Sequence, residues 1–279
     1  MKITQLPDAE PRPRRVAVGT FDGVHRGHRA VIEGADTVLT FEPHPVSVIS
    51  PGNEPKLLTT LQRKAELVAT LGVRELVVIP FDREFASRSA QEFVDDVLVG
   101  RLGATHVSVG ENFHFGNRAQ GDAALLRAES RFETRVAPLL EVDGEIVSSS
   151  HIRGLVAGGA LEYAGTLLGT PFVLDGTVSH GDERGRTLGY PTANLVPREG
   201  YATPGHGVYA GRAQTEDGRW HAAAVNVGVR PMFESGLGEL IEAYLLDFEG
   251  DLYDQLLRLE FLKRLRGEKR FESVEVLLE

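Results

Sequence analysis

Short apolar segments alternate with helical segments through the first half of this chain. The apolar segments are residues 15–21, 36–45, 75–82 and 105–110. Between them, residues 60–72 place apolar side chains on one helical face, and Gly72 suits the position after a helix end. Ser89 and Glu92 form a capping-box pattern that opens a second helix over residues 90–103. Strands alternating with helices of about 10–15 residues predict an α/β domain with a Rossmann-like, doubly wound parallel sheet.

The pattern changes after Gly169, where short strand-like segments follow one another closely. These segments are residues 171–181, 207–214, 219–228, 241–248 and 256–262. The turn sequence TEDGR between the second and third of them is typical of a hairpin. Closely spaced strands predict a small antiparallel β-barrel or sandwich. We therefore expect two domains, residues 1–169 and 170–279, with helices near 150–158 and 160–168 joining the two halves.

Charge and composition exclude several classes of function. The net charge of −10 argues against a broad nucleic-acid surface, because phosphate neutralisation needs a basic face. The chain has no cysteine, so disulfides and thiolate metal sites are impossible. No apolar run approaches the roughly 18 residues of a membrane span, and the first 15 residues lack the apolar centre of a signal peptide. We expect a cytoplasmic protein with no membrane partner.

The stretch GTFDGVHRGH follows the first predicted strand, where ligands of open parallel sheets bind. Gly19 and Gly27 let the backbone approach a ligand, and His25 and His28 fall on one side of a first helical turn, so both can bind one phosphate chain. Two other interpretations stay open on these residues alone. The histidines can be polar surface residues at a helix start. They can also be metal ligands, but a zinc site needs three or four ligands, and Glu33 is the only nearby carboxylate on the helix side.

The whole stretch resembles the GxFDGxHxGH signature of the nucleotidylyltransferase superfamily. Downstream, TFEPHPVSV and GENFHFGNRAQGD resemble motifs of its bacterial FAD synthetase branch, and SSSHIR resembles the closing S-S-T-x-x-R motif. Ser150 stands there in place of threonine and keeps the hydroxyl. The resemblance implies that His25 and His28 are catalytic. It implies ATP or phosphate contacts from Gly19, Phe21, Gly27, His28, Asn112, Ser149, Ser150 and Arg153.

In that branch an FMN phosphate oxygen attacks the α-phosphorus of ATP, and pyrophosphate leaves. The resemblance implies that the histidines stabilise the developing charge while Arg153 holds the β- and γ-phosphates bidentately. Two neighbouring residues keep alternatives open. We expect Asp22 to stabilise the turn through a bond to the backbone. His44 is either a third functional histidine or a loop residue.

A second motif, GDERGRTLGYPTANL at 181–195, resembles the GRxLGxPTAN motif of riboflavin kinases. The resemblance implies a small antiparallel β-barrel, rather than a sandwich, for the second domain. The resemblance implies ATP and Mg²⁺ binding by Gly185, Arg186, Gly189, Pro191, Thr192 and Asn194, with Thr192 and Asn194 as the metal ligands. A hydroxyl and an amide oxygen are hard ligands that suit magnesium. Without its motif, Glu242 would be an outward polar residue of a strand. The resemblance makes it the base that deprotonates the riboflavin hydroxyl, and makes Arg266 a flavin contact.

Together the motifs identify a member of the bifunctional riboflavin kinase and FAD synthetase family, acting on riboflavin, FMN and ATP with Mg²⁺. Three departures are visible: a short first helix, Met232 where threonine is usual, and a chain that stops at Glu279. They leave open an enzyme with only one active module. A flavin- or nucleotide-binding sensor without turnover is the remaining alternative, and the joint presence of Glu242 and both histidines argues against it.

Overall fold

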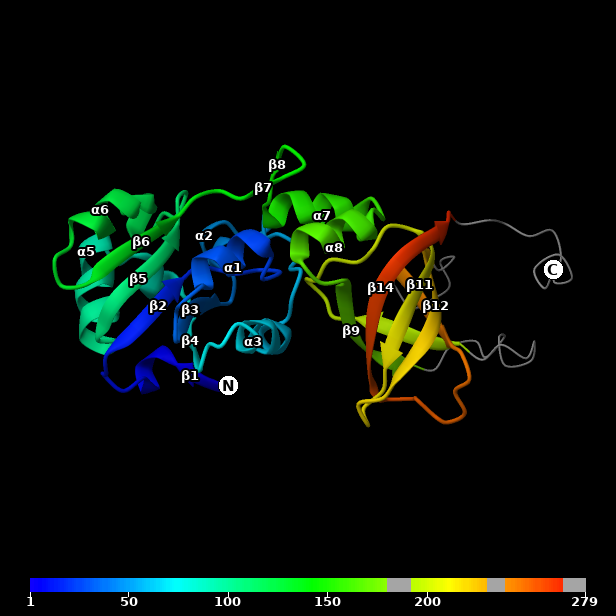
Figure 1. Cartoon of the computed structure of the whole chain (residues 1–279). Coiled ribbons are helices and arrows are strands. Elements are labelled where there is room, and N and C mark those ends of the chain that lie inside the picture. Colours follow the sequence, from blue (N-terminus) through cyan, green and yellow to red (C-terminus); the bar gives the residue numbers. More distant parts are fainter. Residues whose placement is uncertain (180–191, 230–238, 268–279) are drawn as a thin grey trace, which may run out of the picture. The chain divides into compact units, whose positions relative to one another are not determined.

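The computed structural model describes residues 1–179, 192–229 and 239–267 (Figure 1). The chain divides into two compact units, Met1–Ser149 and Ser150–Glu279. No helix in the described ranges is long and apolar enough to cross a membrane. Each unit is built around its own sheet.

The first unit contains the predicted parallel sheet. Its strands are β1 (Lys2–Gln5), β2 (Arg14–Val18), β3 (Thr37–Glu42), β4 (Glu75–Pro80), β5 (Ala104–Gly110) and β6 (Glu133–Ala137). They lie in the order β1-β4-β3-β2-β5-β6, and every neighbouring pair is parallel. The chain winds outward from β2 through β3 and β4, then returns to the other side of β2 as β5. The order of the strands therefore reverses between β2 and β5.

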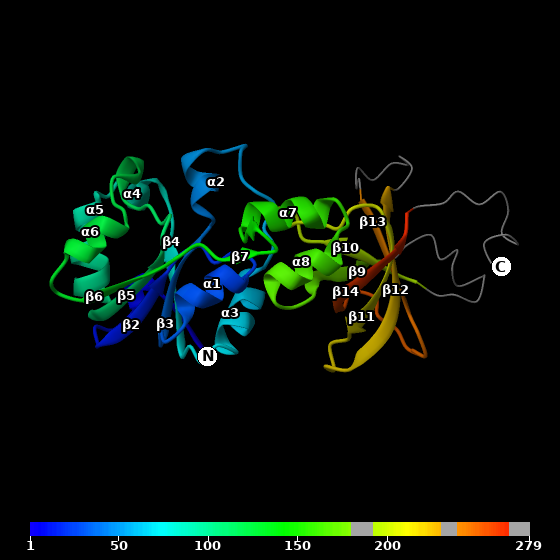
Figure 2. The same cartoon turned by 45° about the horizontal axis from the view of Figure 1, so that its top comes forward.

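Helices cover both faces of this sheet. They are α1 (Arg26–Ile32), α2 (Pro45–Ile49), α3 (Leu61–Ala69), α4 (Arg83–Ala86), α5 (Ala90–Glu92), the π-helix η2 (Phe93–Arg101) and α6 (Ala123–Ala128), with short 3₁₀ turns η1 (Leu6–Asp8) and η3 (Asn117–Ala119). Figures 1 and 2 show α1 and α3 on one side of the strands and α5 and α6 on the other. Alternate strand residues feed two apolar cores: Ala17 packs with α1 and α3, whereas Val16 and Val18 pack with η2 and α6.

Local signals in the sequence account for several helix boundaries. The capping box of Ser89 and Glu92 is present in full, and Thr60 caps α3 by accepting a hydrogen bond from the amide of Arg63. Gly72 follows α3 with a φ of +84°, a conformation that favours glycine. The first helix, α1, has 7 residues, which confirms the short helix expected from the sequence.

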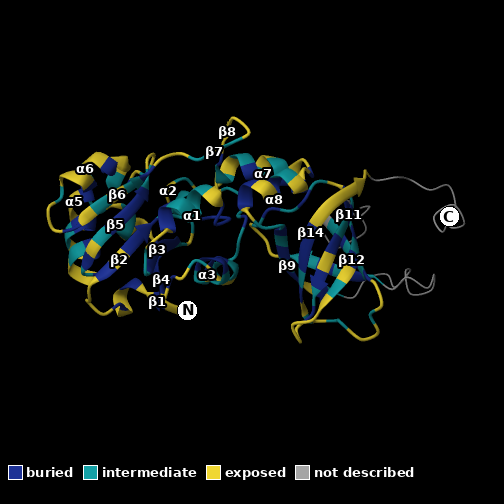
Figure 3. Cartoon of the chain, in the orientation of Figure 1, coloured by how far each residue is buried: buried dark blue, intermediate teal, exposed yellow. Residues whose placement is uncertain are grey.

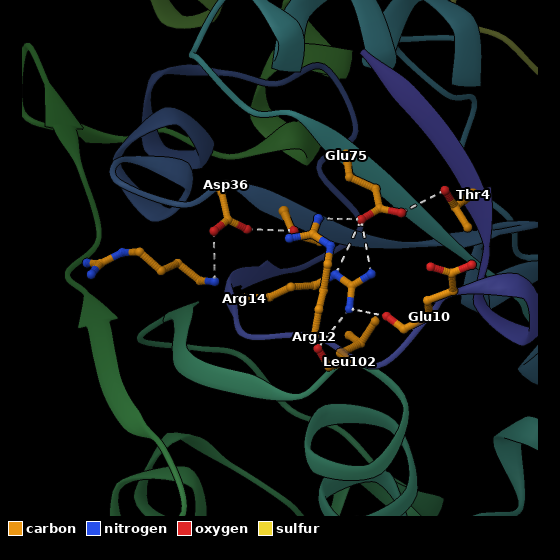
Figure 4. A network of polar contacts seen from close by, with 9 residues as sticks. Thr4, Glu10, Arg12, Arg14, Asp36, Glu75 and Leu102 are labelled. Carbon is orange, nitrogen blue, oxygen red and sulfur yellow. Dashed lines mark hydrogen bonds and ion pairs between the residues drawn. The ribbon is translucent and has the colours of Figure 1, made fainter.

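A buried ion cluster ties the start of the chain to this sheet (Figure 4). The carboxylate of Glu75 accepts hydrogen bonds from Thr4 Oγ1 at 2.8 Å, Arg12 Nη2 at 2.8 Å and Arg14 Nη2 at 3.1 Å. Arg14 is 2% exposed, and its Nη1 also donates to the carbonyl oxygens of Glu10 and Leu102. The cluster joins the first residues of β2 and β4, Arg14 and Glu75, to Thr4 of β1.

The second unit begins with helices α7 (Ser149–Ala157, whose first residue ends the first unit) and α8 (Leu161–Leu168) and continues as a closed barrel. The barrel strands are β9 (Phe172–Ser179), β10 (Ala193–Pro197), β11 (Gly207–Gln214), β12 (Trp220–Val229), β13 (Glu239–Leu245) and β14 (Leu256–Arg266), in the order β10-β13-β12-β11-β14-β9. All their pairings are antiparallel, which confirms the predicted barrel, and residues 215–219 form the predicted hairpin turn. A two-stranded ribbon, β7 (Glu141–Val142) with β8 (Glu145–Ile146), precedes α7.

Buried and exposed residues alternate along the barrel strands (Figure 3). In β13, Ile241, Ala243 and Leu245 are buried, while Glu242 and Tyr244 between them are only half-buried. The buried set fills the barrel, because successive side chains of a strand point to opposite faces. The other set is directed away from the barrel core.

Candidate functional site

A cavity of about 940 Å³ opens in the first unit where the loops after β2 and β5 meet. This is the point at which the strand order reverses, and loops leaving the carboxyl ends of β2 and β5 diverge there. Four residues expected from the sequence line it: Gly19, Phe21, His28 and Asn112. The cavity therefore brings together two motifs that lie some 90 residues apart in the chain.

The loop after β2 has a constrained backbone. Phe21 has a φ of +49° and Val24 a φ of +43°, in the left-handed region that side chains other than glycine rarely adopt. Asp22 is 3% exposed, and its carboxylate accepts hydrogen bonds from the amides of Leu58 at 2.9 Å and Thr59 at 3.2 Å. As expected, Asp22 bonds to backbone, and these bonds reach the segment before α3. Such over-determined contacts hold a strained loop in one shape.

The two histidines of the motif have different positions. His25 is the N-cap of α1: its Nδ1 accepts a hydrogen bond from the amide of His28 at 3.2 Å, and the residue is 5% exposed. The imidazole rings are stacked with centroids 3.5 Å apart, and the edge of Phe21 meets His28 at 5.3 Å. His28 lines the cavity, whereas His25 lies behind it and supports it. Gly27 also lies beside His25, since a Cβ there would be 3.2 Å from the imidazole Cε1.

His44 lies at the start of a helix and at the cavity, and a functional role for it stays a prediction. It caps α2, with its Nδ1 accepting from the amide of Val46 at 3.3 Å, and it also lines the cavity. His28, His44 and His114 reach the cavity from three different segments. Within residues 1–179, 192–229 and 239–267 there is no group of three His, Cys, Asp or Glu residues arranged to hold a metal ion.

An aromatic and basic wall of this cavity was not identified from the sequence. It consists of Phe41, Phe81, Phe85, Phe93, Phe113 and Phe115, with Arg83, Arg88 and Arg118. The rings contact one another in series, and the guanidinium of Arg88 lies 5.2 Å from the ring centre of Phe85. Planar rings beside fixed cations suit a planar ligand that carries phosphate. The repeated phenylalanines of FDREF and NFHF were the available signal.

Glycine at 116 allows the far edge of this wall to form. Gly116 has a φ of +74°, and a Cβ there would lie 2.5 Å from the backbone nitrogen of Ala90. The next residue, Asn117, donates from its amide to the carbonyl of Arg88 at 2.7 Å. The loop after β5 is thereby packed against the start of α5.

The SSSHIR motif lies at the border of the two units. Ser149 Oγ donates to the carbonyl of Asp22 at 2.9 Å, so this serine contacts the strained loop. Ser150 and Arg153 belong to the second unit, where Arg153 Nη1 is 3.4 Å from Ser150 Oγ. Their proposed roles toward ATP stay predictions.

In the barrel, three polar residues form a row across neighbouring strands. Glu242 of β13 stands opposite Asn194 of β10 on one side and Asn226 of β12 on the other. Asn226 Nδ2 donates to Glu242 Oε2 at 3.4 Å. All three are half-buried and alternate with buried core residues, so they share the face directed away from the barrel core. The row places a carboxylate between two carboxamides, one of them from the expected magnesium pair.

The other expected kinase residues are more dispersed. Thr192 lines a second cavity of about 540 Å³ together with residues 248–253 and the barrel ends. Arg266 is exposed at the end of β14 and pairs with Val208 of β11. Val208 pairs in turn with Asn226 of β12. The structure therefore places Arg266 three strands from Glu242 rather than beside it. Gly185, Arg186, Gly189, Pro191 and Met232 lie outside the described residues.

Comparisons with known proteins agree with both halves of this picture. The FAD synthetase family model matches residues 8–151, and the riboflavin kinase family model matches residues 168–279. A Listeria monocytogenes protein named bifunctional riboflavin kinase/FMN adenylyltransferase is 38% identical, over 94% of this chain and 87% of its own. Proteins of the same name from Escherichia coli K12 and Bacillus subtilis are 36% and 37% identical, over 99% and 95% of this chain and 91% and 88% of theirs.

One solved structure resembles the whole chain. It is a crystal structure from Streptococcus pneumoniae of a protein described as a macrolide-efflux protein. The two are 29% identical with a TM-score of 0.89, covering 100% of this chain and 95% of the other. The likeness extends through both units.

Proposed function

The chain belongs to the family of bifunctional riboflavin kinases and FMN adenylyltransferases, and from that premise we propose how its residues divide the two reactions. The enzyme phosphorylates riboflavin with ATP to form FMN, and it adenylylates FMN with ATP to form FAD. The proposed domains are residues 1–169 and 170–279. The start of β9 at Phe172 and of the riboflavin kinase match at residue 168 support that boundary.

Adenylyl transfer takes place in the 940 Å³ cavity. Pockets for single ligands commonly measure about 300–1,000 Å³, so this one is large enough for a bulky nucleotide and part of a second substrate. ATP lies at the end of β2 beside His28 and Asn112, and the flavin of FMN lies against the phenylalanine wall. A phosphate oxygen of FMN forms the new bond to the α-phosphorus while the bond to pyrophosphate breaks. His28 donates to phosphate oxygens as charge moves onto the leaving group, and Arg153, Ser149 and Ser150 bind the departing phosphates.

In the barrel, Glu242 is the base of the kinase reaction. It accepts the proton of the ribityl 5′-hydroxyl as that oxygen attacks the γ-phosphorus of ATP, and ADP leaves. The row Asn194–Glu242–Asn226 is the single observation that carries this assignment, because it fixes the carboxylate beside a predicted ATP and metal ligand.

The donor set of the barrel suits magnesium. The Thr192 hydroxyl and the Asn194 amide oxygen are hard, uncharged ligands, and Mg²⁺ usually keeps waters and substrate phosphates as its other ligands. When bound, the ion would neutralise phosphate charge. Arg266 contributes a cation toward the flavin. The protein works in the cytoplasm, where both reactions would draw on the ATP supply.

The test is one incubation of purified protein with riboflavin, ATP and Mg²⁺, followed by separation of the flavins. The wild type is expected to accumulate FAD. Glu242→Gln should leave riboflavin unchanged yet convert added FMN to FAD. His28→Ala should phosphorylate riboflavin to FMN but form no FAD. The control for Glu242→Gln is Glu199→Gln, which changes an exposed carboxylate of the second unit. The control for His28→Ala is His106→Ala, in β5 of the first unit. Both controls should behave as wild type.

The outcomes separate the alternatives. If the wild type made FMN but no FAD, the proposed adenylyl-transfer activity would be refuted. If it left riboflavin unchanged, the proposed kinase activity would be refuted. Loss of both activities in either variant, with the fold intact, would contradict the division of labour. Binding of flavin without any product would indicate a sensor.

A further inference from the structure

Lys64 is a buried cation on α3, in the first unit. It is 6% exposed and lies among the apolar residues Ala65, Leu67 and Val68 of the same helix. Its Nζ donates to the carbonyl oxygen of Thr20 at 2.7 Å and to Thr40 Oγ1 at 3.2 Å. Thr40 Oγ1 in turn donates to the same carbonyl at 3.1 Å. Two donors from different elements thus converge on one backbone oxygen.

Burying an ammonium group in this position costs folding free energy. Burial lowers the pKa of Lys64, and the negative charges of Asp22 and Glu42 oppose that shift. Apolar side chains can often replace a whole buried ion pair without loss of stability, but removing Lys64 alone leaves the carboxylates of Asp22 and Glu42 without its charge. Methionine matches lysine in length but cannot donate to Thr20 or Thr40.

The carbonyl that Lys64 binds belongs to the loop of the adenylyl-transfer cavity. Gly19, Thr20 and Phe21 all line that cavity. A peptide group is planar and trans, so the carbonyl of Thr20 and the amide N–H of Phe21 point in opposite directions. Neither Lys64 nor Thr40 lines the cavity, so we infer that the carbonyl they share is held away from it. If the peptide rotated, a negative dipole end would face the phosphates instead.

The same peptide also determines where Phe21 and His28 lie. Phe21 adopts its φ of +49° directly after the held carbonyl, and the edge of its ring packs on His28 at 5.3 Å. A shift of this loop would therefore move the imidazole that faces the cavity. Displacements of about 1 Å in catalytic groups can cost on the order of 100-fold in rate.

We propose that Lys64 is a positioning residue for adenylyl transfer: its buried ammonium, with Thr40, holds the Thr20 carbonyl away from the cavity and so fixes Phe21 and His28. The proposal rests on the proposed function of the first unit. It assigns Lys64 no contact with substrate.

The test compares Lys64→Met and Thr40→Val with wild type in the full-length protein. FMN-to-FAD conversion is measured with kcat and KM for ATP separated, riboflavin phosphorylation is measured in the same preparations, and urea unfolding is followed by circular dichroism at 222 nm. Lys64→Met is expected to lower kcat for FAD formation tenfold or more, change KM less than threefold, leave the kinase rate unchanged and lower the unfolding midpoint, while the protein stays folded in the urea-free assay buffer. Lys56→Met, an exposed lysine before α3, is the control and should match wild type.

Thr40→Val removes one of the two donors and should lower the same kcat about threefold to tenfold. The double variant should be no slower than Lys64→Met, because both substitutions release one carbonyl. A wild-type kcat in Thr40→Val would overturn the proposal even if Lys64→Met failed to fold. A kcat loss no larger than the fraction of Lys64→Met that is unfolded in the assay buffer would overturn it in favour of a merely structural role. Absence of FAD formation by the wild type would instead overturn the proposed function, and this proposal with it.

Discussion

Replacing Glu75 with glutamine is expected to destabilise the first unit by about 3–5 kcal/mol, the range for removing one partner of a buried ion pair. The Arg14 and Glu75 side chains are only 1% and 5% exposed. The glutamine keeps the volume and a carbonyl oxygen, so the change removes charge rather than packing. The guanidinium of Arg14 would remain buried, with backbone carbonyls as its remaining partners.

The two units can be followed separately because of where the chromophores lie. The single tryptophan and all 6 tyrosines come after residue 160, so tryptophan fluorescence reports on the second unit. Circular dichroism at 222 nm follows the helices, most of which belong to the first unit. With a urea m-value of about 2 kcal/mol/M, the loss corresponds to a midpoint lower by roughly 1.5–2.5 M in the dichroism signal. The fluorescence midpoint should not move.

Glu33→Gln is the matched control. Glu33 pairs with Arg135 at 2.8 Å, but their side chains are 76% and 47% exposed, so the change should cost less than about 1 kcal/mol. An effect of Glu75→Gln no larger than that of the control would refute the reasoning. So would an equal shift of the fluorescence midpoint, since it would mean that the substitution acts on both units.

The sign of the pH dependence follows from the same cluster. Burial alone raises the pKa of Glu75, but hydrogen bonds from Thr4, Arg12 and Arg14 outweigh it and hold the pKa below its usual value of 4.5. Stability from a depressed carboxyl pKa is present above the unfolded value and is lost as pH falls through the folded value. The gap between wild type and Glu75→Gln should therefore be widest near pH 7 and narrow below about pH 4.5. A gap that widened in acid would contradict this.

Two further substitutions test the sites themselves. Gly116→Ala should destabilise the first unit by more than about 1–3 kcal/mol and raise KM for FMN, since its Cβ would lie 2.5 Å from the backbone nitrogen of Ala90. Gly144→Ala is the control: Gly144 has a φ of +81°, and a Cβ there would have nothing within 4 Å, so this variant measures the cost of the backbone conformation alone. If both variants lost the same stability in urea unfolding, the predicted clash with Ala90 would be refuted. Asn226→Leu should lower kcat of the kinase about tenfold by removing the hydrogen bond to Glu242, while FAD formation from FMN stays unchanged. A kinase kcat within twofold of wild type would refute that role.

Hydrophobic periodicity was sufficient to predict the parallel sheet of the first unit and the antiparallel strands of the second, while the resemblance to riboflavin kinases decided between barrel and sandwich. Ala17 and Val18 face opposite cores of the parallel sheet, and Ile241 and Glu242 face opposite sides of the barrel wall. A period of two for strands and near 3.6 for helices decides such faces locally, so no distant contact has to be known. The loop at Gly19 was found for a similar reason, because glycines and histidines directly after a strand form a local pattern.

What escaped prediction depends on long-range register and docking. A lysine on a helix is usually exposed, so the sequence gives no sign that Lys64 is buried. Its hydrogen bonds to Thr20 and Thr40 depend on how α3 packs on the sheet. The wall formed by Phe85 and Phe113 joins segments that follow β4 and β5, which are separated by β3 and β2 in the sheet. Asn226 becomes a neighbour of Glu242 only through the pairing of β12 with β13. Periodicity does not specify any of these pairings.

The alternation along β13 also determines how this strand can be engineered. Deleting one residue between Glu239 and Leu245 would carry Glu242 into the barrel and bring Ala243 out, so both the packing and the chemistry would be lost in one step. A substitution at Tyr244, in contrast, alters only the wall that faces away from the core. A variant library aimed at new flavin analogues should therefore keep the strand length and Glu242 constant and randomise the other outward positions, such as Tyr244. Libraries that admit insertions or deletions there should yield almost no folded barrels.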